Sequence, residues 1–268
     1  MVEEYLAALR AAGRAEGTLH RYRSILRVAV EGGAGTAVPG DLAPATRLLR
    51  HKVVSGFFNW AMNAGYVDAN PLALRPAPRL EQAVPRSIPS DELARLGRVL
   101  RKAPLRTRAV FTLILECGLR EAEACAMRVR DVDLTTRGQE GVRVLGKGAK
   151  ERFVPLPAGY QSRALLRRLT AGRAGDEFVF SARGGLAPST SGLRKAWAGV
   201  CHAAGVEGYS VHCLRHTAAT RMLERTQDLQ LVSRLLGHSS VAVTARYTLR
   251  SDAALRRAME TAGGGWHR

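Results

Sequence analysis

Three segments in the first 80 residues carry apolar residues at helical spacing. The first is 2–13; the second is 18–33, which starts at Thr18, a suitable N-cap, and stops at a glycine pair. The third segment, 45–65, has an apolar stripe made of Leu48, Val53, Phe57, Trp60 and Ala61. This pattern predicts three helices, with GAGTAVPG (33–40) as a loop between the second and the third.

A proline-rich stretch follows these helices. Residues 68–90 contain five prolines and show no hydrophobic period, which is typical of a linker. The chain has 268 residues, which is long for one compact domain. We therefore predict a helical domain over 1–80, a linker over 81–88 and a second domain over 89–268.

The second domain mixes helical and alternating patterns. Residues 142–148 and 150–157 alternate apolar and polar side chains around a Gly-Lys-Gly-Ala turn, and so predict a β-hairpin. The stretch EFVFSA (177–182) predicts another short strand. Helices are expected over 91–103, 105–117, 121–129, 159–171, 189–204, 211–224, 228–237, 240–248 and 252–260. The predicted fold class is mainly α with a small antiparallel β-sheet.

The charge balance points to a particular kind of partner. Lysines and arginines number 41 against 23 acidic residues, a net charge of +18, and the isoelectric point is about 11.0. A surplus of this size favours a polyanion such as nucleic acid, although a GC-rich genome that encodes much arginine is the alternative origin. The chain is 46% hydrophobic, so its composition is that of a folded protein.

The cysteines and the hydropathy predict a compartment. The four cysteines form no CxxC pair and lie in apolar or helical surroundings; they are Cys117, Cys125, Cys201 and Cys213. We expect them to be reduced, as in an intracellular protein. The longest apolar run, near AVFTLILECGL, is too short to span a bilayer, and no signal peptide pattern is visible. The expected location is the cytoplasm, with no membrane partner.

The stretch VHCLRHTAATRM raises the first chemical question. It places His212, Arg215 and His216 at positions i, i+3 and i+4, which share one face of a helix. Three interpretations are open: a zinc ligand pair, a solvated basic face, or a clamp for an anion. Adding Cys201 or Cys213 gives no standard zinc spacing, and the arginine between the histidines is unsuited to a metal. Elsewhere, the GKG around Lys147 lacks the frame of a P-loop.

Four stretches taken together resolve the question. In chain order they are CGLREAEACAMRVRDVDL, VLGKGAKERFVPLP, HCLRHTAATRM and LLGHSSVAVTARYT. In sequence and order they resemble the tyrosine recombinases, the family of phage integrases and Xer recombinases, over roughly 88–250. The resemblance implies the catalytic set Arg120, Lys147, His212, Arg215, His238 and Tyr247. It further implies that Glu123 buttresses the first arginine, and we interpret His216 as a support residue.

The chemistry of a phosphodiester explains these residue types. Two arginine forks, on Arg120 and Arg215, match the non-bridging oxygens, where negative charge develops. Tyr247 would attack the phosphorus with His212 as its general base, and Lys147 would protonate the leaving 5′ oxygen. His238 would hydrogen-bond the phosphate. The product is a 3′-phosphotyrosyl intermediate that keeps the bond energy, so neither metal nor ATP nor other cofactor is expected.

The resemblance also implies partners and an architecture. A helical core-binding domain and a catalytic domain would form a C-shaped clamp on double-stranded DNA bearing an inverted-repeat site, with a homotetramer at synapsis, a monomer when free, and accessory proteins in some systems. The tail, 251–268, would dock on its own domain or, as the resemblance favours, on a neighbouring subunit. Basic residues supply the candidate DNA contacts, Arg47, Arg50, Lys52, Lys150 and Arg152; for those at 47–52 a solvated basic face is the alternative interpretation. The rival interpretations are a type IB topoisomerase and a catalytically idle DNA-binding regulator of the same fold.

Overall fold

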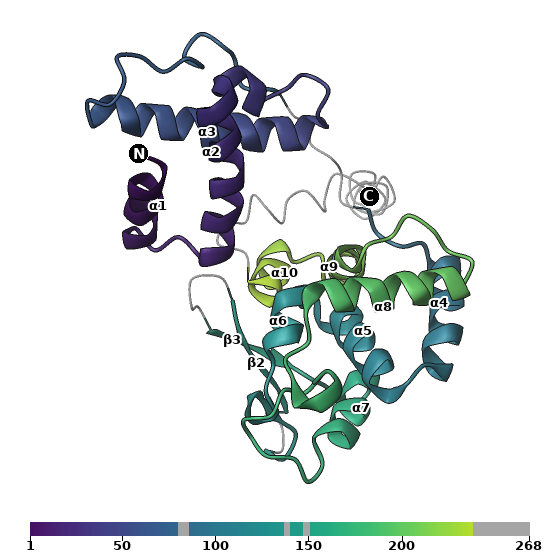
Figure 1. The fold of residues 1–268 in the computed structure, drawn as a ribbon. Coiled ribbons are helices and arrows are strands. Elements are labelled where there is room, and N and C mark those ends of the chain that lie inside the picture. The colour runs from purple at the N-terminus through teal and green to yellow at the C-terminus, as the bar shows by residue number, and fades with distance from the viewer. Residues whose placement is uncertain (80–85, 137–139, 147–150, 238–268) are drawn as a thin grey trace, which may run out of the picture. The chain divides into compact units, whose positions relative to one another are not determined.

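The computed structural model describes residues 1–79, 86–136, 140–146 and 151–237. They fall into two compact units, divided between Ala83 and Val84 (Figure 1). Most of the predicted linker 81–88 lies outside the described residues, as do the predicted helices 240–248 and 252–260. Each unit is described separately.

The first unit is a set of three helices, α1 (Val2–Ala11), α2 (Glu16–Ala37) and α3 (Pro44–Asn63). Their apolar faces meet in one core that includes Leu6, Leu26 and Phe57, all at most 1% exposed. Tyr5 packs its ring edge-on against Phe57 at a centroid distance of 5.5 Å. Val53 and Phe57 of the predicted apolar stripe on the third helix belong to this core, and Trp60 packs against it.

Two predictions about the second helix were wrong. Helix α2 begins at Glu16 after Ala15, so Thr18 lies inside its first turn and does not cap it. The first part of the predicted loop is helical: the backbone breaks at Gly33 (φ +84°) and then makes a further helical turn to Ala37, whereas 38–40 lie outside any helix, as predicted. Ala34 and Ala37 are buried in the core, and this burial favours the extra turn over the loop that the glycines predicted.

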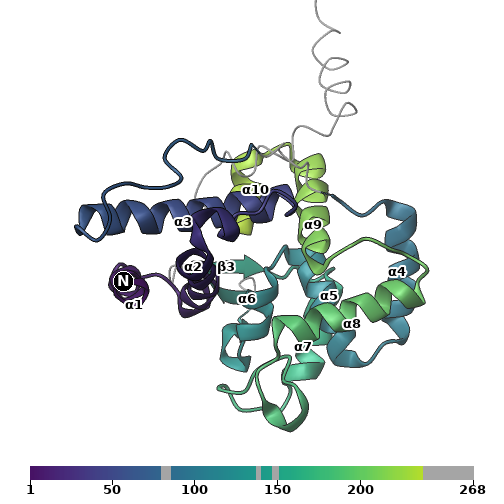
Figure 2. The same cartoon turned by 45° about the horizontal axis from the view of Figure 1, so that its top comes forward.

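The second unit is mainly helical, as predicted. Its helices are α4 (Ser90–Lys102), α5 (Leu105–Cys117), α6 (Glu121–Ala126), α7 (Gln161–Thr170), α8 (Thr190–Ala203), α9 (Val211–Thr226) and α10 (Leu229–Leu236). Short 3₁₀ turns lie at Val129–Asp131 and Arg183–Gly185. Helix α5 packs between α7 and α9, as both views show, and supplies much of the core (Figures 1 and 2).

The predicted hairpin forms a small antiparallel sheet with one additional strand. The order is β1 (Val132–Asp133), β2 (Gly141–Leu145) and β3 (Glu151–Pro155), with Val142 opposite Val154. Val142, Val144 and Val154 are buried, whereas Leu145 and Phe153 point outward and are exposed. This alternation is the period of two that the sequence showed. The tip of the hairpin, 147–150, lies outside the described residues.

The prediction of a strand at 177–182 was wrong. The segment makes a single bridge, between Arg128 and Phe178. Arg173 donates hydrogen bonds to the carbonyls of Phe178 and Val179, so these groups are not offered to a neighbouring strand. Val179 and Phe180 are apolar because they are buried in the core, at 1% and 2% exposure.

The four cysteines are buried and free, which agrees with reduced thiols. Across the part of the chain that the structure describes, no helix combines the length and the apolar character needed to cross a membrane.

Candidate active site

Arg120 is placed by a sharp turn between α5 and α6. Gly118 ends α5 in the left-handed conformation, at φ +65°. A Cβ on this glycine would lie 2.6 Å from Cδ2 of Leu236, so close packing with α10 also requires glycine. Leu119 is buried, and Arg120 then becomes the N-cap residue of α6 with its side chain 35% exposed. The turn therefore presents the guanidinium at the surface of the second unit.

Glu123 is the buried anion that organises the site. One carboxylate oxygen accepts from the backbone N–H of Arg120 at 2.8 Å, and the other accepts from its Nη1 at 2.7 Å. Arg152 donates to both oxygens, at 2.8 and 2.7 Å. Burial alone would raise the pKa of Glu123, but the hydrogen bonds and charges of Arg152 and Arg120 outweigh it and lower this pKa to about 2. The carboxylate is therefore ionised at neutral pH.

Arg215 lies on α9 and is almost wholly buried, with its side chain 2% exposed. Its Nη1 donates to the carbonyl of Gly118 at 2.6 Å, and its Nη2 donates to the carbonyl of Leu236 at 2.8 Å. Nη1 lies 3.9 Å from Glu123. The two predicted arginines, Arg120 and Arg215, thus converge on one carboxylate from different helices.

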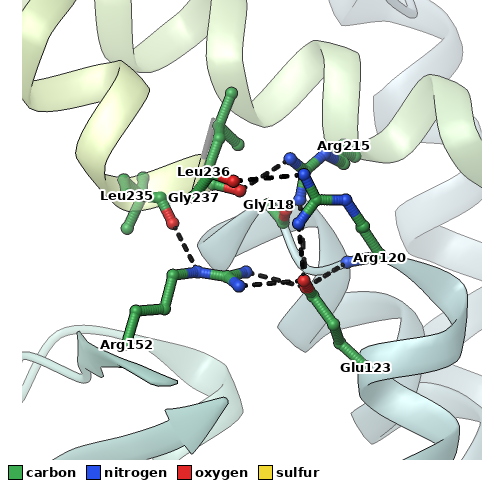
Figure 3. Close-up of polar contacts among 8 residues, drawn as sticks. All are labelled: Gly118, Arg120, Glu123, Arg152, Arg215, Leu235, Leu236 and Gly237. Atoms are coloured by element: carbon green, nitrogen blue, oxygen red, sulfur yellow. Dashed lines mark hydrogen bonds and ion pairs between the residues drawn. The ribbon is translucent and has the colours of Figure 1, made fainter. Parts of the chain in front are cut away.

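The C-terminal end of α10 is held by three arginines. Arg152 Nε donates to the carbonyl of Leu235 at 2.9 Å, as Arg215 does to Leu236, and Arg120 Nη2 donates to the carbonyl of Gly237 at 3.3 Å (Figure 3). These carbonyls carry the partial negative charge of a helix end, which cations stabilise. Three guanidinium groups share one carboxylate, so the cluster keeps a positive charge suited to a phosphate.

His212 lies one helical turn before Arg215 on α9. Its ring meets that of His216 edge to face, with centroids 4.3 Å apart. Although His212 is exposed at the surface, desolvation by the surrounding protein, and then the charges of Arg215 and Arg120, lower its pKa below the ordinary value. Glu121 acts in the opposite direction. The net effect favours the neutral imidazole, the form that can accept a proton.

Several predicted site residues cannot be placed. Lys147, Lys150, His238 and Tyr247 lie outside the described residues. Strand β2 ends at Leu145, shortly before the two lysines in sequence, and helix α10 ends at Leu236, shortly before His238. Within the described ranges, no group of three His, Cys, Asp or Glu side chains could hold a metal ion.

The candidate DNA contacts of the first unit have different surroundings. Arg47 donates to the carbonyl of Gly40 at 3.0 Å, and Arg50 donates to that of Ala37 at 3.3 Å. Both side chains thus hold the segment that precedes α3. Lys52, by contrast, is exposed.

Arg152 lies in surroundings that the sequence analysis did not foresee. It was expected to face DNA, but its guanidinium lies on Glu123 and its side chain is only 11% exposed. The signal was present in the strand pattern. Arg152 and Val154 are two residues apart in β3, so both point to the buried face of the sheet. The carbonyl partners at Gly118 and Leu235–Gly237 are backbone groups, which sequence motifs do not mark.

Comparisons with known proteins show the family of this chain. The chain matches the model of the phage integrase family over residues 86–253. It is 37% identical over 197 residues to tyrosine recombinase XerC of Xanthomonas axonopodis pv. citri, covering 72% of this chain and 63% of that protein. To tyrosine recombinase XerC of Myxococcus xanthus it is 32% identical over 232 residues, covering 82% and 76%. The chain therefore belongs to the phage integrase family, the tyrosine recombinases.

The fold is shared with solved structures at lower identity. A crystal structure of a lambda integrase(75-356) dimer bound to a COC′ core site superimposes with a TM-score of 0.72 at 19% identity, covering 90% of this chain and 95% of that one. This likeness confirms the predicted fold class of a helical protein with a small antiparallel sheet.

Proposed function

We propose that this chain is a site-specific recombinase that cleaves and rejoins DNA strands through a 3′-phosphotyrosyl intermediate. The observation that carries the proposal is the convergence of Arg120 and Arg215 on buried Glu123, with His212 one turn away. Residues far apart in sequence thus form one cationic site, as the motif order predicts.

The two arginines would bind the non-bridging oxygens of the scissile phosphate. Glu123 fixes the fork of Arg120, and the carbonyls of Gly118 and Leu236 fix that of Arg215. Donors that are held in place before the reaction stabilise developing charge without reorganising. Preorganisation of this kind is typically the largest contribution to catalysis at such a site.

Proton transfer would be divided among three residues. His212, whose pKa is lowered, is a suitable base for the hydroxyl of Tyr247. Lys147, in the hairpin between β2 and β3, would protonate the leaving 5′ oxygen, and His238 would hydrogen-bond the phosphate. The phosphotyrosyl bond forms as the bond to the 5′ oxygen breaks, and attack by a 5′ hydroxyl reverses the step.

The proposed partner is double-stranded DNA with an inverted-repeat site, bound in the cytoplasm. Its phosphates match the net charge of +18. Exchange between two such sites requires four active subunits, and segment 251–268 would dock on the neighbouring one. A chain that only binds DNA would have no use for a buttressed arginine pair beside a neutral histidine.

Trapping the covalent adduct tests this proposal. A binding site is first selected from a random duplex library by retention on the protein, and is then nicked so that the cleaved end diffuses away. Wild-type protein should become covalently linked to the DNA, Tyr247→Phe should bind without linking, and Tyr160→Phe should behave as wild type. If the wild type binds DNA but forms no adduct, the result would refute the proposal and support the catalytically idle DNA-binding regulator. If the wild type relaxes supercoiled DNA but does not exchange strands between two sites, the result would support the type IB topoisomerase instead.

A further inference from the structure

Arg152 is the one member of the arginine cluster to which the proposed mechanism gives no role. Each of its three guanidinium nitrogens donates a hydrogen bond within the protein: Nη1 and Nη2 to Glu123, and Nε to the carbonyl of Leu235. Its side chain is 11% exposed, against 35% for Arg120. A side chain held by three short bonds in this way cannot turn to a DNA phosphate without leaving a buried carboxylate poorly paired.

The position of Arg152 links three elements of the second unit. It starts from β3, reaches the first turn of α6 through Glu123, and reaches the last turn of α10 through Leu235. The close approach to α10 depends on Gly237: a Cβ there would lie 3.1 Å from Cδ of Arg152, and the residue has φ +64°. The packing around Arg152 is therefore specific to this side chain.

Arg152 also determines how Glu123 is shared. With Arg152 in place, Arg120 gives Glu123 only Nη1, while its Nη2 lies on the carbonyl of Gly237. Without Arg152, each carboxylate oxygen would lose one of its two hydrogen-bond donors, so that one oxygen would keep only Nη1 of Arg120 and the other only its backbone N–H. Arg120 could then turn both ends of its fork to Glu123, as Arg–carboxylate pairs prefer. That rotation would withdraw the guanidinium from the site.

We propose that Arg152 is a positioning residue: by holding both carboxylate oxygens of Glu123 and the carbonyl of Leu235, it keeps Arg120 directed at the scissile phosphate and α10 in register with the hairpin. The proposal rests on the proposed function, because DNA cleavage is its readout. It gives Arg152 no direct contact with DNA.

The test separates binding from cleavage in Arg152→Gln and Arg152→Lys. The matched control is Arg143→Gln, an exposed arginine on the neighbouring strand β2. Affinity for the selected duplex is measured over a salt series, and adduct formation is measured in a single turnover at saturating protein. We expect unchanged affinity and salt slope, with cleavage slower by about 10²-fold in Arg152→Gln, the effect of a displacement near 1 Å. Arg152→Lys keeps the positive charge but not the planar, bidentate guanidinium, and should recover only part of the cleavage rate.

A double-substitution cycle identifies the path of the effect. If Arg152 acts through Glu123, Arg152→Gln should slow cleavage far less in the Glu123→Gln protein than in the wild type. A salt slope smaller by about 0.9 with full cleavage at saturation would instead make Arg152 a phosphate contact and overturn the proposal. Wild-type cleavage in both variants would also overturn it. If Arg152→Gln does not fold, the same measurements on Arg152→Lys decide between these outcomes. Absence of an adduct in the wild type would refute the proposed function instead.

Discussion

Acidification should unfold the second unit in large part through Glu123. The pKa of this carboxyl is about 2 in the folded chain, against 4.5 when it is unperturbed. A lowered native pKa stabilises the fold above the unfolded pKa, and this contribution disappears as the pH falls from about 4.5 towards 2. The difference between the two pKa values, at about 1.36 kcal/mol for each unit, corresponds to about 3 kcal/mol of folding stability.

The matched variant is Glu123→Gln, which cannot titrate. It should be less stable than the wild type at pH 7, since it leaves Arg152 and Arg215 without their buried counterion. The difference between the two proteins should shrink by about 3 kcal/mol between pH 5 and pH 2, because only the wild type loses a charge. Asp133, whose pKa is also about 2, contributes equally to both proteins.

The assay is urea unfolding over a pH series, followed by the fluorescence of Trp197. This side chain is 2% exposed in the core of the second unit; Trp60 and Trp266 are replaced by Phe so that the signal reports that unit alone. Glu224→Gln, an exposed change on α9, serves as the control and should follow the wild type. Parallel pH curves for the wild type and Glu123→Gln would refute the assignment of Glu123 as the buried counterion.

Three more predictions concern the geometry and protonation of the site. Gly118→Ala should destabilise the second unit by about 2–4 kcal/mol and slow cleavage, because the left-handed backbone and the methyl contact with Leu236 both oppose it; a melting temperature equal to that of the wild type would contradict this. Glu121→Gln should move the acid limb of the cleavage profile to lower pH, because the charge of Glu121 raises the pKa of His212; a shift to higher pH would contradict this electrostatic effect. Lys147→Ala should slow cleavage by about 10²–10⁴-fold, and a 5′-bridging sulfur should restore it, since a thiolate leaves without a proton; equal impairment on both substrates would remove the lysine from this role.

Local signals in the chain were sufficient to predict most of the secondary structure. Helix α5 is bounded by Pro104 and by Gly118, and the observed range 105–117 equals the predicted one. The hairpin strands β2 and β3 follow from a period of two, which only a half-buried sheet requires. The order of four motifs predicted the family, and the family match over 86–253 confirms it.

Predictions failed where burial or hydrogen bonds from a side chain outweighed local preference. The glycine-rich 33–40 predicted a loop, but Ala34 and Ala37 fill the core of the first unit and extend the helix. The apolar 177–182 predicted a strand, but Arg173 takes its carbonyls. Neither burial nor the hydrogen bonding of a side chain five or six residues away follows from the apolar pattern alone.

The sequence by itself predicted, through its resemblance to the family, which residues carry the chemistry: two arginines with a nearby acid, and a histidine one turn from the second arginine. Their types suit the charge that develops on a phosphodiester. Only the tertiary structure decided that Arg152 holds Glu123 and that three arginines bind successive carbonyls at the end of α10. The physical reason is that backbone carbonyls are common to all residues. Their role as partners arises only where packing leaves a helix end facing a buried cation.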